Sequence, residues 1–262
     1  MQALRTATTG MSAQQTNVEV ISNNIANMNT IGYKKQQAQF EDLLYDNVER
    51  MGTQSSASGT TVPTGIQIGS GVKTGSIYRI MTQGSPTLTG NTYDMAINGR
   101  GYFQILMPSG ETAYTRAGNF SLNEQGQLVT TDGFTVQPTI TIPAAATSVT
   151  VSQTGLVQYT LDGQAAPTTA GQMQIASFAN EGGLEAIGNN LFLESGSSGT
   201  PSIASPGDTG YGTVMQKYIE SSNVDAVSEV TSLISAQRAY EMNSKVITAA
   251  DQMLSTASQM KS

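Results

Sequence analysis

Apolar residues recur at heptad spacing through the first residues of the chain. Two interleaved rows make up the pattern: Leu4, Met11, Val18 and Ile25, and Ala7, Gln14, Ile21 and Met28. Such rows occupy the a and d positions of a coiled coil, here with one polar exception, and predict an amphipathic helix. Gly32 stands where a left-handed residue would cap that helix, so residues 1–32 are predicted to be the N-terminal helical segment.

The same design returns within residues 217–262. The rows there are Leu233, Tyr240, Ile247 and Leu254, and Ala236, Asn243, Ala250 and Ala257. A further apolar stripe lies about 100° round the same helix. Its members are Ala239, Val246, Met253 and Met260. One partner helix cannot cover both faces, so the pattern favours association of several helices over a helix that only covers its own domain.

Between the two ends the pattern changes to short β-branched or aromatic runs. Runs such as YFQILM, FTVQPTITI and LVQYTL alternate with turns such as PSGE, NEQG and LDG. This texture predicts hairpins, so residues 72–216 are expected to form an all-β domain. Residues 33–71 are polar and glycine-rich and are expected to be an extended linker or loop. The predicted fold class is mixed α and β, with long terminal helices that pair as a coiled coil and an inserted all-β central domain.

Composition argues against the commonest enzyme chemistries. The 262 residues include no histidine, cysteine or tryptophan, which removes the usual general base, thiolate chemistry and most transition-metal ligands. The net charge is −7, and no basic cluster indicates binding to nucleic acid or to a membrane surface. No stretch approaches the roughly 20 apolar residues of a transmembrane helix, and no cleavable secretory signal stands at the N-terminus. We therefore expect a chain that either stays in the cytoplasm or leaves it without signal cleavage.

No motif for catalysis, a cofactor or a metal emerges. The segment DMAINGRG places Asp94 and Asn98 as in a calcium loop, but Ala96 and Ile105 stand where further oxygen ligands are needed. A tight β-turn explains it better. Phosphate-binding glycine loops and nucleophile elbows are absent from the sequence. Scattered acids could still meet in space as a carboxylate pair, although nothing in the pattern points to one.

The end of the N-terminal pattern is rich in asparagine. Asn23, Asn24, Asn27 and Asn29 fall within seven positions, although asparagine is a poor helix former whose amide is costly to bury without partners. In a packed helical tube, which the family resemblance described next implies, these amides could exchange hydrogen bonds between subunits and fix their register. Alternatively, they only cap and fray the end of the helix.

Both ends of the chain resemble a known family. The segments SNNIANMNTIGYKK and SSNVDAVSEVTSLISAQRAYEMNSKVITAADQMLSTASQM resemble the axial proteins of the bacterial flagellum, the rod and hook family. In the middle, YDMAINGRGYFQI and NEGGLEAIGNNLFLE are similar to its distal rod members. Proximal rod and hook-type proteins are the nearest alternatives within the family.

The resemblance implies a structural subunit without catalysis. Proteins of this family leave through the flagellar export apparatus without a cleaved signal and polymerise helically into a rigid hollow driveshaft across the periplasm. The terminal helices then line an inner tube, and the β domain forms the outer layer. The partners implied are further copies of the chain, the proximal rod and hook proteins, and the surrounding ring proteins, with neither nucleic acid nor membrane insertion.

Two sets of residues follow as expectations. A segment within residues 46–71 is expected to stiffen the rod, and its apolar residues are Met51, Val62, Ile66 and Ile68. The expected subunit-interface residues are Leu4, Met11, Val18, Ile21, Asn23, Asn24, Ile25, Asn27, Met28, Gly32, Leu233, Tyr240, Asn243, Val246, Ile247, Met253 and Leu254.

Functions of other classes stay open from the sequence alone. One is a periplasmic wall-cleaving hydrolase on an oligomerising stalk, which would need a positioned pair of carboxylates in a cleft. Another is a filament-capping or adhesin module, which would show a ligand-binding surface without continuous helical stacking.

Overall fold

The structure, a computed structural model, describes residues 2–49, 64–164 and 166–261 and divides into two compact units. The helical unit comprises the described residues of Met1–Ile25, Gln36–Tyr78 and Asp225–Ser262. The β unit comprises Ala26–Lys35 and the described residues of Arg79–Val224. Each unit therefore contains segments from distant parts of the chain.

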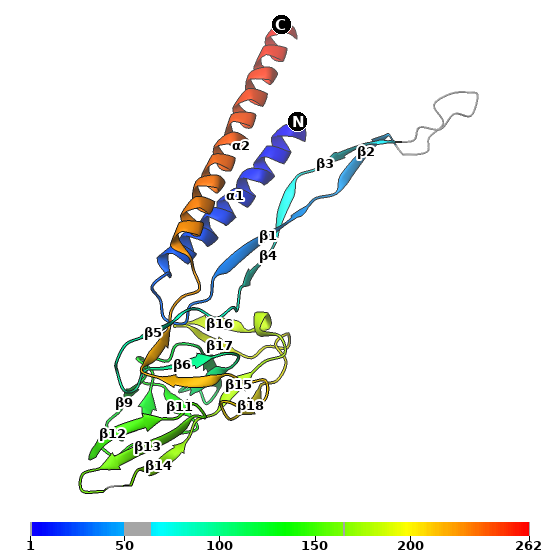
Figure 1. Cartoon of the computed structure of the whole chain (residues 1–262). Coiled ribbons are helices and arrows are strands. Elements are labelled where there is room, and N and C mark those ends of the chain that lie inside the picture. Colours follow the sequence, from blue (N-terminus) through cyan, green and yellow to red (C-terminus); the bar gives the residue numbers. More distant parts are fainter. Residues whose placement is uncertain (1, 50–63, 165, 262) are drawn as a thin grey trace. The chain divides into compact units, whose positions relative to one another are not determined.

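The helical unit contains one long helix from each end of the chain (Figure 1). Helix α1 spans Gln2–Ala26 and α2 spans Ala226–Lys261. Asp225 begins α2, because its carboxylate accepts the backbone N–H of Ser228 at 2.8 Å and lies at the positive end of the helix dipole. The mixed class, with a helix at each end and a β-rich middle, is confirmed.

Two narrow ribbons complete the helical unit. Strand β1 (Gln36–Asp42) pairs with β4 (Val72–Arg79), and β2 (Tyr45–Glu49) runs antiparallel to β3 (Ile66–Gly69). We expected an extended linker across residues 33–71, and the structure forms strands there. Half-buried and exposed positions alternate along β1, but most of its residues are polar, so the apolar–polar alternation that identifies a strand in a sequence is weak there.

The expected rod-stiffening segment falls partly on this second ribbon. Ile66 and Ile68 lie on β3 and are exposed. Met51 and Val62 lie outside the described residues.

Several antiparallel sheets make up the described part of the β unit. The largest has β16, β17, β8, β7, β11, β10 and β9 in that order, with β15 pairing β7 and β18. A second has the order β12-β13-β14, and two strand pairs, β19-β6 and β20-β5, attach the C-terminal part. The strands are β5 (Pro86–Leu88), β6 (Met95–Asn98), β7 (Tyr102–Leu106), β8 (Thr112–Thr115), β9 (Ser121–Leu122), β10 (Leu128–Val129), β11 (Thr135–Gln137), β12 (Ala146–Val151), β13 (Leu156–Leu161), β14 (Thr168–Gln172), β15 (Ile175–Ser177), β16 (Glu185–Gly188), β17 (Leu191–Leu193), β18 (Ser202–Ala204), β19 (Thr213–Gln216) and β20 (Tyr218–Glu220).

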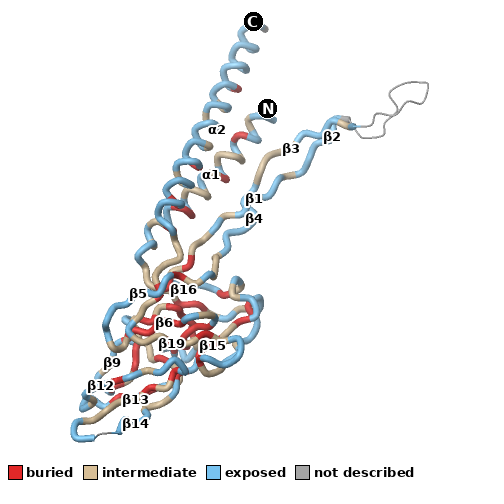
Figure 2. The backbone as a smooth tube through the Cα atoms, viewed as in Figure 1, coloured by how far each residue is buried: buried red, intermediate tan, exposed pale blue. Residues whose placement is uncertain are grey.

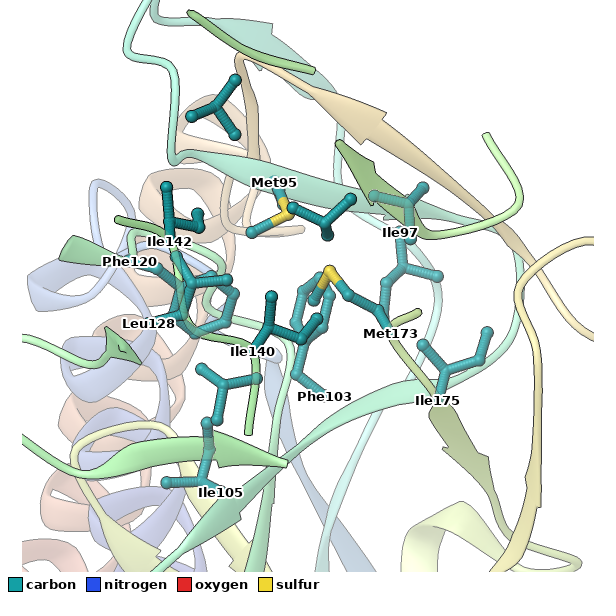
Figure 3. Packing of buried hydrophobic residues seen from close by; sticks show 14 of the residues in the cluster. Met95, Ile97, Phe103, Ile105, Phe120, Leu128, Ile140, Ile142, Met173 and Ile175 are labelled. Carbon is teal, nitrogen blue, oxygen red and sulfur yellow. The ribbon is translucent and has the colours of Figure 1, made fainter. Parts of the chain in front are cut away.

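Two apolar clusters form the core of the described part of the β unit, and the larger one is shown in Figure 3. Strands β6 and β7 contribute Ile97, Phe103 and Ile105, all fully buried. Phe103 meets Phe120 edge to face, with ring centroids 5.1 Å apart. The buried residues concentrate in this unit, whereas most of α2 is exposed (Figure 2). The stability of the chain therefore resides mainly in the β unit.

The limits of the β unit differ from the expected 72–216. It begins at Arg79, because β4 pairs with β1 of the helical unit. It extends to Val224, because Tyr218, Ile219 and Glu220 of β20 pair with β5. It also includes Ala26–Lys35, which we had assigned to the N-terminal helix and the linker.

Candidate assembly site

The two long helices contact each other within the helical unit, at α1 residues that lie outside the predicted rows. Gly10 of α1 lies against Asn243 of α2, so closely that a Cβ at Gly10 would stand 3.0 Å from the Asn243 amide nitrogen. Asn24 near the end of α1 bonds to Glu229 near the start of α2. Among the expected interface residues, Ile21 is buried, and the following are half-buried: Leu4, Met11, Val18, Ile25, Leu233, Asn243 and Ile247.

The further stripe on α2 is largely exposed. The exposed fractions are 47% for Val246, 67% for Met253 and 80% for Met260. Met242, which the sequence reasoning missed, is 60% exposed and completes a second series at spacings of three and four residues. We call Ala239, Met242, Val246, Met253 and Met260 the second α2 face. Tyr240 and Leu254 of the first row are also partly exposed, at 40% and 44%.

Helix α1 has a second buried face that the sequence reasoning did not identify. Ala13 and Val20 are buried, although neither belongs to the predicted rows. The hydroxyl of Thr9 accepts the backbone N–H of Val72 at 3.3 Å, so the ribbon of the same chain contacts α1. In the sequence, only the seven-residue spacing of Ala13 and Val20 could have indicated this buried face.

The Asn24 amide is satisfied inside its own chain. Its nitrogen donates to the Gln36 carbonyl at 2.8 Å and to a Glu229 carboxylate oxygen at 3.0 Å, and its oxygen accepts the Gln36 N–H at 2.9 Å. The residue is buried, so its amide ties α1 to β1 and α2 rather than reaching a second subunit. Asn23 and Met28 are exposed, and Asn27 is half-buried.

Gly32 also has a different role from the expected helix cap. Helix α1 ends at Ala26, and Gly32 has a left-handed φ of 69°. Its N–H donates to the Glu220 carbonyl at 2.8 Å. A Cβ here would lie 2.7 Å from the Ala117 nitrogen, so only glycine allows this close approach.

A buried ionic cluster lies next to Gly32 in the β unit. One Glu220 carboxylate oxygen accepts from Lys34 Nζ at 2.5 Å and from the Gly84 N–H at 2.9 Å. The other oxygen accepts from Arg116 at 3.2 Å. All three charged side chains are almost completely buried. The cluster joins the N-terminal segment, the core and the last strand of the unit.

Secondary contacts complete the cluster. Lys34 also donates to the Thr82 carbonyl at 2.9 Å, and Arg116 donates to the Gly99 carbonyl at 2.7 Å. Burial lowers the pKa of Lys34, and the facing Glu220 carboxylate opposes that shift. Arg116 lies 5.3 Å from the ring centroid of Tyr102. Burial, reinforced by the Glu181 charge, raises the pKa of Tyr102.

A groove of about 500 Å³ lies between the two helices. Val18 and Tyr240 line it with apolar surface, and Glu19 and Glu241 add carboxylates. It is an apolar depression with acidic groups among its lining residues.

The segment DMAINGRG forms a turn in which its acid bonds to neighbouring side chains. Asp94 is engaged in its own turn, where its oxygens accept from Thr89 at 2.6 Å and from Asn91 at 2.9 Å. Residues 2–49, 64–164 and 166–261 contain no group of three acids close enough to hold a metal ion. Neither α1 nor α2 combines the length and apolar character needed to cross a membrane.

Three family descriptions match separate parts of the chain. Residues 4–34 match the flagella basal body rod protein family. Residues 96–159 match the flagellar hook protein FlgE/F/G D1 domain, and residues 215–260 match the C-terminal region of the flagellar basal body rod FlgEFG proteins.

Whole-length relatives agree with these matches. A flagellar basal-body rod protein FlgG from Caulobacter vibrioides is 66% identical over 262 residues, which is all of both chains. The protein of the same name from Agrobacterium fabrum is 52% identical over 98% of each chain. That from Bacillus subtilis is 42% identical over 97% of each.

The position of Asn24 gives a prediction for the helical unit. Asn24→Asp keeps the size of the side chain but turns an oxygen toward the Gln36 carbonyl and the Glu229 carboxylate. We expect it to lower the free energy of unfolding by about 2–3 kcal/mol near neutral pH. Burial and Glu229 raise the pKa of the introduced carboxyl group, so the loss should shrink as the pH falls from about 8 to about 5.

Chemical denaturation at both pH values measures the effect. Asn29→Asp, at an exposed position shortly after the same helix, is the matched control. Equal losses in the two variants, or a loss that does not depend on pH, would contradict the role assigned to Asn24.

Proposed function

This chain belongs to the FlgG family of flagellar basal-body rod proteins, and from that membership we propose that it is a non-catalytic structural subunit of the distal rod. In this proposal it polymerises helically into a rigid hollow driveshaft. The shaft transmits motor torque to the hook and lets exported subunits pass. Its partners are further copies of the chain, the other axial proteins, the ring proteins and the export apparatus that delivers it without signal cleavage.

The observation that carries the proposal is the exposed second α2 face. Met242, Met253 and Met260 are each at least 60% exposed, on one side of a single helix. Burying such side chains stabilises a contact by about 1.5–3 kcal/mol each. Apolar surface of this extent on a soluble chain is typical of an interaction site, and heptad spacing is the pattern that a partner helix fits.

The contrast with α1 supports a partner from outside the chain. The ribbon of the same chain contacts α1 at Thr9, and Ala13 and Val20 are buried. The second α2 face has no such cover among the described residues. We therefore assign it to contact with a neighbouring subunit.

A neighbouring copy offers a complementary surface in its own groove. The groove is lined by Val18 and Tyr240 and lies beside the first row of α2, not on the second face. A contact between two different surfaces of identical chains is heterologous and can repeat without closing. Repetition of that contact would build a helical polymer.

The remaining expected interface residues enter the proposal in two groups. The half-buried row residues, including Leu233 and Ile247, pair α1 with α2 as a coiled coil within each copy. Exposed residues, including Val246, Met253 and Leu254, face other copies. Asn24 and Gly32 make their contacts within one chain, so the proposal does not assign them to the subunit interface.

The α2 face gives a direct prediction for assembly. Met253→Asp removes apolar surface and places a charge in a closed contact, so we expect the concentration needed for polymerisation to rise at least about tenfold. Gln252→Asp adds the same charge at a neighbouring exposed position outside this face and should polymerise nearly as the parent chain does. Sedimentation and electron microscopy measure both. Normal polymer from Met253→Asp would exclude this face from the subunit contact.

The second ribbon gives a prediction for stiffness. Ile66 and Ile68 are exposed on β3, and we propose that they contact neighbouring subunits and resist bending. Removing residues 46–69 should leave polymer that forms through the helices but has a shorter persistence length on micrographs. Unchanged stiffness would exclude the ribbon from this role, and loss of all polymer would make it an assembly element instead.

A further inference from the structure

The chain passes between the helical unit and the β unit at four points, and three of these stretches of backbone share contacts within the β unit. Lys35 leads into β1, Ile80 follows β4, and Val224 precedes the residue that caps α2. All three stretches depart from one small region of the β unit. The Ile80 N–H donates to the Lys35 carbonyl at 2.8 Å, which already joins two of them.

Asn223 ties the three stretches together through its side chain. Its amide oxygen accepts the Lys35 N–H at 2.7 Å, and its amide nitrogen donates to the Ile80 carbonyl at 2.8 Å. The same nitrogen lies 3.1 Å from both the carbonyl and the hydroxyl of Thr82. Only a side chain with a donor and an acceptor on one planar group can make this set of bonds.

The ionic cluster anchors the same region from within the β unit. Lys34 is the neighbour of Lys35 in the chain, and Glu220 lies three residues before Asn223. If the segment carrying Lys34 or the strand carrying Glu220 separates from the β unit, a buried charge loses its partner, which is strongly unfavourable. We call Lys34, Arg116, Glu220 and Asn223 the root junction, since α1 ends shortly before it and α2 begins shortly after it.

The two helices need help to pair in a free chain. The buried residues of the predicted rows on the two helices include Ala7, Ala236 and Ala250. Such small side chains bury little apolar area. Isolated helices are marginal in water. Bringing together two helices from opposite ends of a long chain also carries a loop-closure cost.

We propose that the root junction is a positioning device that brings the C-terminal end of α1 and the N-terminal end of α2 together as the β unit folds. With the junction closed, α1 ends and α2 begins a short way along the chain from the same set of residues. Their pairing then becomes a local event, and the bond between Asn24 and Glu229 is the first contact beyond the junction. The order of events is therefore β unit first and helix pair second. This proposal concerns the single chain and does not depend on polymer formation.

The chain suits a distance measurement because it contains no cysteine. Ser22→Cys on α1 and Ser232→Cys on α2, both at exposed positions, would carry the only two spin labels. Pulsed electron paramagnetic resonance on the dilute monomer then reports the distribution of distances between the helices. Amide exchange in β7 and β8 reports separately whether the β unit is folded.

The decisive variant is Asn223→Ala, which removes the shared amide without leaving a buried charge. We expect its helix-to-helix distribution to broaden at least about twofold, with exchange protection in β7 and β8 unchanged. Asn180→Ala is the matched control, because Asn180 also donates to a backbone carbonyl of the β unit, that of Ser197 at 3.0 Å. It should keep the narrow distribution.

A second pair of variants tests the ionic part of the junction. Glu220→Gln should broaden the distribution further, whereas Glu41→Gln, in an exposed ion pair with Lys73, should not change it. An unchanged distribution in Asn223→Ala would overturn the proposal. A broadened distribution accompanied by lost exchange protection in β7 and β8 would also overturn it, since Asn223 would then stabilise the β unit itself rather than position the end of α1 and the start of α2.

Discussion

The burial of Glu220 between Lys34 and Arg116 is the constraint on which the rest of the structure depends. Each partner comes from a different part of the chain, and each side chain is almost completely buried. Replacing such a cluster with apolar residues can leave stability unchanged, but removing one partner typically costs about 3–5 kcal/mol. The cluster therefore specifies which segments meet, and it fixes within the β unit the segment that follows α1 and the strand that precedes α2.

This constraint explains how a chain with weakly paired helices can present them in a defined way. The contact between α1 and α2 includes small or polar residues such as Gly10 and Asn243. Such a contact leaves the larger apolar side chains of α2, including Met253 and Met260, facing outward. A stable β unit thus carries helices whose apolar surface is only partly used within one chain, which is what a subunit of a helical polymer requires.

The parts of the fold that could be predicted are those with local signals. Heptad rows such as Leu233 and Ile247 identify a helix without knowledge of its partner, and turn residues divide the middle of the chain into strands. The ribbon of β1 and β4 could not be predicted in this way, because its half-buried positions are mostly polar and give no clear apolar alternation. Its contact with Thr9 depends on a residue that lies far away in the sequence.

The candidate site shows the same division. The exposed stripe through Val246 and Met253 could be predicted from spacing alone. The role of Asn24 could be predicted only as a buried amide in need of partners, because Gln36 and Glu229 become its partners only in the folded chain. Lys34, Arg116 and Glu220 carry no motif, so no sequence pattern indicated their cluster. Membership of the FlgG family indicates the kind of assembly, and the geometry indicates the surfaces that could form it.

A reconstruction of the assembled protein by electron cryomicroscopy, at a resolution that shows side chains, tests the central claim most directly. The account predicts a hollow tube whose inner wall is formed by α1 and α2, with Met242, Met253 and Met260 of each copy buried against a helix of the next. A polymer in which the β units make the contacts while these three methionines stay exposed to solvent would contradict it.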